Sequence, residues 1–223
     1  MIATSEFLFI TDYSGCMTQW DISSGKLHHN WGTIHSDIIT SIAITHDEKF
    51  IFTSSIYDSI KQWNLSSRQL IHTYQDPILE GSIGKMVISS NGKWLFTGGS
   101  SSVKKINIKT KCIAQEYGKN DGIKSNINCF VVNAKLLFIS WSIGYLLAMD
   151  YESDKVVHCL GKIHQSKINC MVLSPDGKTL FTSDDGGVST GGLVTGAVMC
   201  QWDILKWKLV KNWGVIHQTT VKS

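Results

Sequence analysis

The 223-residue sequence predicts an all-β fold in which a four-stranded antiparallel sheet is repeated radially about five times. The first observation is a short apolar phrase that recurs every 42 to 44 residues and contains Phe9, Phe52, Phe96, Phe138 and Phe181. The second is a pair of related stretches, CMTQWDI and SIKQWNL, that are also 43 residues apart. The third is that no segment has the 3.6-residue periodicity of an amphipathic helix. Because two independent markers share one period, we interpret the repeat as the unit of the fold.

The second repeat shows the four expected strands most clearly. A β-branched run covers residues 38–44, and the turn 46–49 separates it from a second strand over residues 50–54. A third strand is expected over residues 60–65, and a fourth over residues 69–74 after the turn Ser66-Ser67. The corresponding first turns of later repeats read SSNGK (89–93) and SPDGK (174–178), and their Asn-Gly and Asp-Gly pairs favour chain reversal. Each period therefore predicts one small antiparallel sheet.

The third and fourth repeats lack the tryptophan, and Ile106 and Met149 occupy its position. Apolar packing is expected to replace polar contacts there. In the last repeat Trp202 follows Met149 by 53 residues, which is one period plus ten. The excess predicts a glycine-rich loop at about residues 188–197, between the second and third strands. We consider both a tolerated insertion and a partner contact for this loop.

Tryptophan and histidine positions carry a family resemblance. Trp20, Trp63 and Trp202 end the third strands, and Asp21, Asn64 and Asp203 follow them directly. Three histidines precede first strands at the same phase of the repeat: His35, His164 and His217. With these residues, essentially the whole chain resembles the WD40-repeat family. The resemblance implies a single β-propeller domain over residues 1–223, built from four-stranded blades around a central channel, and it implies no particular activity.

The chain departs from the family pattern at one polar position. In the family an Asp six residues before the Trp bonds the His, but Ser14, Tyr57 and Ile143 stand there in this sequence. A His–Asp–Ser–Trp network is therefore not expected in most repeats. Asp12 and Asp184 lie near this position in their own repeats.

The two ends of the sequence contain the same phrase, LHHNWGTIH at 27–35 and LVKNWGVIH at 209–217. In register, residues 219–223 correspond to the front of a first strand, and Met1 corresponds to the end of one. One interpretation is a closed ring of five blades in which the N- and C-termini share one blade. The other is a fragment of a larger WD40 array, open or completed by a partner, for which self-association is expected.

Composition argues against several functional classes. The net charge of +3 is small and scattered, so no nucleic acid is expected, and no apolar run approaches the roughly 18 residues of a membrane span. The N-terminal stretch lacks the basic region of a secretory signal. Six cysteines without a CxxC pair predict reduced thiols in the cytoplasm, with no metal and no cofactor. Because the sequence contains no GxSxG or HExxH motif, we expect no catalytic residues and no enzymatic activity.

Partner contacts are expected where the second strand of each blade ends, on the face that the family layout makes the top of the propeller. The candidate residues follow each marker phenylalanine by three or four positions or lie in the next turn: Asp12, Tyr13, Ser55, Tyr57, Trp141, Tyr145, Asp184 and Asp185. The alternative is that Trp141 and the tyrosines only cap the packing of the blades. We predict a non-enzymatic scaffold that binds proteins or peptides through this face. A lectin-like propeller is the alternative, but it would repeat one pocket in every blade, whereas this position varies from Asp to Gly99 to Trp.

Overall fold

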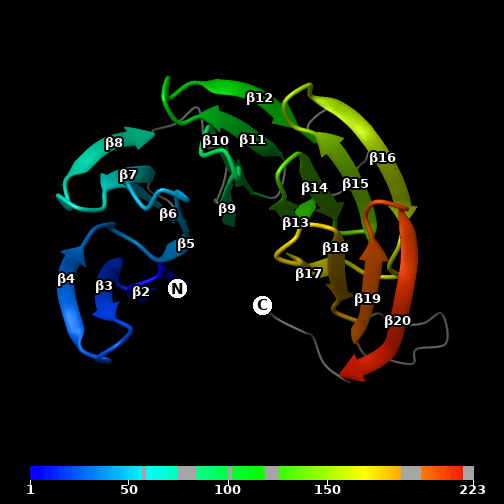
Figure 1. Ribbon diagram of the computed structural model, residues 1–223, viewed down its shortest axis with the longest axis horizontal. Helices are drawn as coiled ribbons and strands as arrows, with labels where there is room; N and C mark the ends of the chain where they lie inside the picture. Colours follow the sequence, from blue (N-terminus) through cyan, green and yellow to red (C-terminus); the bar gives the residue numbers. More distant parts are fainter. Residues whose placement is uncertain (57–58, 75–83, 100–101, 119–125, 187–196, 218–223) are drawn as a thin grey trace. The chain divides into compact units, whose positions relative to one another are not determined.

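The computed structural model describes residues 1–223 except 57–58, 75–83, 100–101, 119–125, 187–196 and 218–223. The described residues form twenty strands in five four-stranded antiparallel sheets, with no helix, and within each sheet the strands follow chain order (Figure 1). The all-β prediction with five four-stranded sheets is therefore confirmed. In the described part of the chain, no helix offers the length and apolar character needed to cross a membrane.

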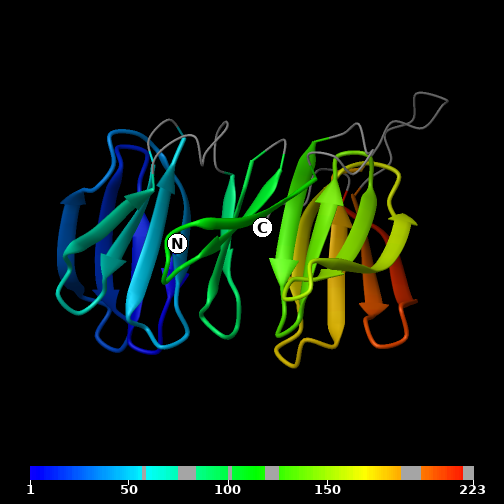
Figure 2. The same cartoon turned by 90° about the horizontal axis from the view of Figure 1, so that it is seen from above.

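The strands divide between two compact units, Met1–Tyr117 and Gly118–Ser223. Because neighbouring strands are antiparallel and follow chain order, the connections of each sheet lie at its two opposite ends (Figure 2). The strands of the first unit are β1 (Ile2–Ala3), β2 (Phe7–Thr11), β3 (Cys16–Asp21) and β4 (Leu27–Thr33), β5 (Ile39–Ile44), β6 (Phe50–Ser55), β7 (Ile60–Asn64) and β8 (Leu70–Tyr74), and β9 (Lys85–Ile88), β10 (Trp94–Gly98), β11 (Val103–Asn107) and β12 (Ile113–Tyr117). The strands of the second unit are β13 (Ile127–Val132), β14 (Leu136–Trp141), β15 (Tyr145–Asp150) and β16 (Lys155–Lys162), and β17 (Ile168–Leu173), β18 (Thr179–Asp184), β19 (Ala197–Asp203) and β20 (Lys208–His217). The strands expected for the second repeat agree with β5–β8 to within one residue at each end.

The core of each unit consists of apolar layers between successive sheets. In the first unit, Phe9 and Met17 of one sheet pack with Ile39 and Ile51 of the next. Phe52 and Tyr74 pack in turn with residues of the third sheet, among them Leu95 and Ile106. In the second unit, residues such as Phe138, Leu146 and Ala148 pack with Ile168, Met171 and Leu180. Because strand side chains alternate between faces, each sheet contributes one row of residues to each neighbouring layer.

One turn has the same construction in all five sheets. After each third strand, the side-chain oxygen of an Asp or Asn accepts a hydrogen bond from the backbone N–H three residues later: Asp21–Ser24, Asn64–Ser67, Asn107–Thr110, Asp150–Ser153 and Asp203–Lys206. The next residue has a positive φ of 53 to 65°: Gly25, Arg68, Lys111, Asp154 and Trp207. Such turns join β3 to β4 and its equivalents, and they explain why Asp or Asn recurs after the tryptophan position.

The apolar positions of the third and fourth repeats are buried as expected. Ile106 is fully buried in the first unit, and Met149 is 6% exposed in the second. Apolar packing therefore replaces the polar tryptophan contacts at these positions.

The fifth sheet leaves more of one face exposed than the other sheets do. Phe9, Phe52, Phe96 and Phe138 are fully buried, whereas Phe181 is only half-buried. Val172, the cross-strand neighbour of Phe181, is 56% exposed, whereas Ala43, the neighbour of Phe52, is 5% exposed. Met199 and Gln201 on the same face are also half-buried.

The predictions of a shared blade, of a long loop and of a single domain stay predictions. β1 contains only two residues and pairs with β2, so an N-terminal segment supplies a short first strand to the first sheet. Residues 219–223, which would complete a shared blade, lie outside the described residues. The predicted loop at 188–197 also lies outside them, except for Ala197, which is the first residue of β19. The prediction of a single domain over residues 1–223 is likewise left open.

Candidate functional site

A hydrogen-bonded cluster links the recurring histidine and tryptophan in the last sheet. The Trp202 indole N–H donates to the Thr182 hydroxyl (3.0 Å), and this hydroxyl lies 2.7 Å from Nε2 of His164. The Asp184 carboxylate lies 3.2 Å from Nδ1 of His164 and can only accept when ionised, so Nδ1 carries a hydrogen. The tautomer with Nδ1–H lets Nε2 accept from the Thr182 hydroxyl. All four residues come from β18, β19 and the segment before β17. They form a network of the His–Asp–Ser–Trp type, with Thr182 in place of the serine. Such a network was not expected from the sequence in most repeats.

The second sheet holds the same arrangement of histidine, threonine and tryptophan. His35 Nε2 lies 2.8 Å from the Thr53 hydroxyl, to which the Trp63 indole N–H donates at 3.0 Å. Both His35 and Thr53 are buried. In the first sheet the Trp20 indole instead donates to Thr18 within its own strand, at 2.9 Å. His35, His164 and their tryptophans thus take part in hydrogen bonds within the sheets, and their structural role stays a prediction. The side chain of His217 lies outside the described residues.

Asp184 belongs to this buried cluster rather than to an exposed surface. Its side chain accepts hydrogen bonds from the backbone N–H of Gly186 (3.2 Å) and Val198 (2.8 Å) as well as facing His164. Burial acts to raise the pKa of the Asp184 carboxyl, but the hydrogen bonds from His164 and from these N–H groups outweigh it and lower the pKa. The residue is 3% exposed and is thus not presented to a partner.

Two glycines hold the histidine segments in place, and sequence reasoning missed them. The carbonyl of Gly15 accepts from the N–H of Ile34 (2.9 Å) and His35 (3.2 Å), and the carbonyl of Gly144 accepts from Ile163 and His164 in the same way. Both have positive φ, +77° and +81°, and a Cβ at either position would lie 2.1 Å from the backbone oxygen of the histidine. Their spacing of 129 residues, three periods, is the signal that could have found them.

The turn between β2 and β3 is the clearest exposed feature among the predicted contact residues. Tyr13 is 85% exposed. Asp12 beside it accepts hydrogen bonds from the Ser14 hydroxyl (2.8 Å) and from the N–H of Ser14 and Cys16 (both 2.9 Å). These bonds lower the pKa of the Asp12 carboxyl. The bond from the Ser14 hydroxyl is the largest cause and the bond from the Cys16 N–H is the second. A fixed turn therefore presents an aromatic ring and a carboxylate to solvent.

The other predicted contact residues are less accessible. Ser55 (1% exposed) and Trp141 (0%) are buried, and among the described residues neither the Ser55 hydroxyl nor the Trp141 indole N–H has a hydrogen-bond partner. Tyr145, the first residue of β15, is half-buried. Asp185 forms an ion pair with Lys167 (3.1 Å). Tyr57 lies outside the described residues. In the positions described, Trp141 fits the alternative interpretation, in which it serves packing.

Within the described residues, no group of three or more His, Cys, Asp or Glu side chains is arranged to hold a metal ion. All six cysteines are described, and none forms a disulfide.

Sequence comparisons relate the chain to WD-repeat proteins. A family model described as WD domain, G-beta repeat, matches residues 26–64 and 155–189. The chain is 24% identical over 179 residues to the guanine nucleotide-binding protein subunit beta of Oryza sativa subsp. japonica, covering 73% of this chain and 47% of that protein. It is 28% identical over 78 residues to the WD repeat domain-containing protein 83 homolog of Dictyostelium discoideum, covering 33% of this chain and 24% of that protein. The chain thus spans about half the length, or less, of these curated relatives.

A solved structure has the same fold. The structure of U3-55K superposes with a TM-score of 0.75 at 15% sequence identity, covering 94% of this chain and 61% of that one. The four-stranded sheets, the recurring His–Thr–Trp clusters and the two family matches agree with one another. The chain therefore carries WD40 repeats, as the sequence resemblance predicted.

Proposed function

We propose that this chain is a non-enzymatic scaffold that binds other proteins or peptides through the end of its sheets that carries the β2–β3 turn. The observation that carries the proposal is Tyr13, an 85% exposed aromatic residue on a turn fixed by three hydrogen bonds to Asp12. Exposed aromatic anchors on rigid supports contribute much of the energy of protein interfaces, because little conformational entropy is lost on binding. One relative is named as a subunit of a guanine nucleotide-binding protein, which is consistent with this kind of function.

The buried histidines support the non-enzymatic part of the proposal. His35 and His164 each lie within hydrogen-bond distance of a strand threonine and serve the sheet structure. The residue three positions after each marker phenylalanine differs between repeats, which argues against the repeated pocket that a lectin would use. The net charge of +3 favours neither nucleic acid nor a membrane surface as partner. A cytoplasmic location is also proposed, on the ground that six cysteines form no disulfide.

Self-association is a further part of the proposal. Val172 is 56% exposed at a position where Ala43 of the second sheet is buried, and the half-buried Phe181 stacks on Trp213 with ring centroids 6.2 Å apart. Apolar side chains on an exposed sheet face favour contact with another sheet.

The test compares the wild-type chain with Tyr13→Ala as bait in native extract, with bound proteins identified by mass spectrometry. We expect Tyr13→Ala to lose at least about half of the specifically captured protein while its melting temperature changes by no more than about 2 °C, because an exposed side chain contributes little to stability. Leu205→Ala is the matched control, since Leu205 is 72% exposed on another turn. Equal capture by wild type and Tyr13→Ala would contradict the proposed face.

A further inference from the structure

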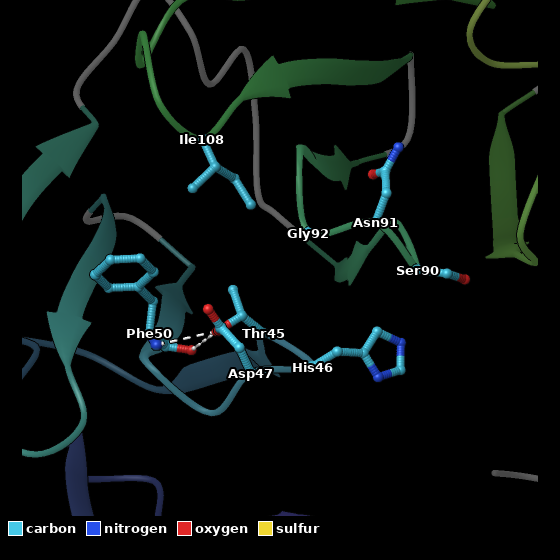
Figure 3. Close-up of a pocket in the computed structure, with 8 residues that line it drawn as sticks. All are labelled: Thr45, His46, Asp47, Phe50, Ser90, Asn91, Gly92 and Ile108. Carbon is cyan, nitrogen blue, oxygen red and sulfur yellow. Dashed lines mark hydrogen bonds between the residues drawn. The ribbon is translucent and has the colours of Figure 1, made fainter.

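A cavity of about 590 Å³ lies in the first unit, between the second and third sheets. Its walls come from the start of β6, from β8, and from the β9–β10 and β11–β12 turns. A smaller cavity of about 320 Å³ adjoins it and shares Phe50, Gly92 and Ile108 with it. In Figure 3, which draws the smaller cavity, Ile108 reaches in from the third sheet and Phe50 and Asp47 from the second, while His46 and Ser90 point away. These turns are at the opposite end of the sheets from the β2–β3 turn and its equivalents.

The floor of the larger cavity is apolar and partly open to solvent. Ile71 on β8 is 40% exposed, Phe50 is half-buried and Ile108 is 7% exposed. The position of Phe50 is fixed, because its N–H donates to the Thr45 hydroxyl at 3.0 Å. An apolar side chain of a partner would be desolvated against these three residues.

The rim of this cavity is basic. Lys93, Lys109 and Lys111 line it, and none of its described lining residues is an Asp or Glu. The β11–β12 turn that carries two of them is rigid, because the Asn107 side chain accepts from the N–H of Lys109 and of Thr110 at 3.0 Å each. The positive charge of Lys111 also acts on His72 of β8. The pKa of His72 is lowered, first by burial of the imidazole and second by this charge. Asp47, in the smaller cavity, is already paired with Lys49 at 3.1 Å.

We propose that this lysine-rimmed cavity, defined by Phe50, Ile71, Ile108, Lys93, Lys109 and Lys111, binds an acidic segment of another protein that inserts one apolar side chain. Charge complementarity selects the occupant: carboxylates of the segment face the lysines, and the apolar side chain covers the floor. The volume falls within the roughly 300–1,000 Å³ typical of ligand sites. This site goes beyond the scaffold function proposed above, because it concerns the other end of the sheets and does not depend on Tyr13.

A nucleic acid is the less suitable occupant. A phosphate backbone would use the lysines but would leave the aliphatic part of the floor uncovered. Of the three floor residues, Phe50 offers a flat ring on which a base could stack, whereas Ile71 and Ile108 do not. An acidic peptide with a leucine, isoleucine, methionine or phenylalanine uses both features at once.

The test measures binding of fluorescein-labelled hexapeptide pools to the full chain by fluorescence anisotropy. The first pool flanks one Leu, Ile, Met or Phe with Asp and Glu; the second replaces that apolar residue with Ser; the third replaces the acidic residues with Lys. We expect the first pool to bind most tightly, and more weakly at high salt. The double variant Lys109→Glu/Lys111→Glu and the single variant Ile71→Ser should each weaken binding by at least about tenfold. The control Lys26→Glu/Lys208→Glu makes the same change in net charge elsewhere and should bind as wild type does.

Several outcomes would overturn the proposal. These are no binding of the first pool at about 1 mM peptide, a concentration that corresponds to about −4.1 kcal/mol; equal binding of the first and second pools; or equal losses in the cavity and control double variants. Tighter binding of an oligo-dT probe than of the first pool would assign the cavity to nucleic acid instead. If Lys109→Glu/Lys111→Glu lowers the melting temperature, the Ile71→Ser variant decides the question. Tyr13→Ala should leave peptide binding unchanged, so this test is independent of the scaffold proposal.

Discussion

At the scale of single residues, a threonine hydroxyl joins histidine and tryptophan in two of the sheets. Thr53 and Thr182 each bring together a buried imidazole and the indole N–H of a half-buried tryptophan, so neither group is left without a partner. An unsatisfied buried polar group costs roughly 1–3 kcal/mol, and the threonine hydroxyl removes that cost at the histidine. Asp184 adds an ionised group that holds the proton-bearing nitrogen of His164.

Asp184 predicts a specific loss of stability in acid. Its pKa in the folded chain lies below the ordinary value of 3.8, so the stabilisation it provides is present above that value and is lost as the pH falls through the lower folded-state pKa. We expect Asp184→Asn to lower the melting temperature at pH 7 and the difference from wild type to shrink as the pH falls below 3.8. Thermal unfolding followed by circular dichroism over a pH series measures this. Asp203→Asn, on the partly exposed ion pair with Lys206, is the control, and a difference from wild type that grows in acid would contradict the sign.

At the scale of elements, turns rather than strands fix how successive sheets are joined. Gly15 and Gly144 lie in turns between second and third strands, yet their carbonyls accept from the segment that leads into the following sheet. The contact is close because these residues lack a Cβ. One turn therefore sets the position of the histidine that the next sheet uses in its polar cluster.

Gly144→Ala tests this arrangement. A methyl group would meet the His164 carbonyl at 2.1 Å, and φ is +81°, so we expect a loss of about 3 kcal/mol in the free energy of unfolding from steric overlap and backbone strain together. Gly161→Ala separates the two causes, because Gly161 has a similar φ of +69° but nothing lies within 4 Å of its added Cβ. The free energy of unfolding of that control, measured by urea denaturation, should fall by only about 1 kcal/mol. Equal losses for both variants would show that the close contact is unimportant.

At the scale of the whole molecule, the fifth sheet differs from the others in the exposure of one face. Phe181, Met199 and Gln201 are half-buried there, whereas Phe52, Ile60 and Gln62 at the same strand pairings are buried. An exposed apolar sheet face of this kind favours association with another sheet at high concentration.

We expect wild-type chain to show concentration-dependent association by sedimentation velocity, and Val172→Asp to reduce it because a carboxylate on that face would have to be desolvated. The control is Val156→Asp, since Val156 on β16 has the same 56% exposure. Association that is equally strong in both variants, or absent in wild type at about 100 μM, where even weak contacts with a Kd of that order would register, would rule out this face.

Much of the fold could be predicted from the sequence because its signals lie within short stretches of chain. The recurring Phe and Trp positions, the Asn-Gly and Asp-Gly turns and the Asp or Asn after each third strand are all local features. They predicted the strands of the second repeat to within one residue. Recurrence and the family resemblance also predicted a structural role for His35, His164, Trp63 and Trp202, and their hydrogen bonds to Thr53 and Thr182 agree with that prediction.

The candidate sites were decided by tertiary structure. Ser55 and Trp141 occupy the same phase of the repeat as exposed Asp12, but burial depends on what packs over each position, and the period does not encode that. Asp184 forms its network although 18 residues separate it from Trp202, because β18 and β19 pair across the inserted segment. The lysine-rimmed cavity combines residues from 50 to 111, which only folding brings together. The sequence by itself determined the repeating sheets, since local propensity and turn chemistry are written in contiguous residues; which side chains face solvent and which meet across sheets depended on three-dimensional packing.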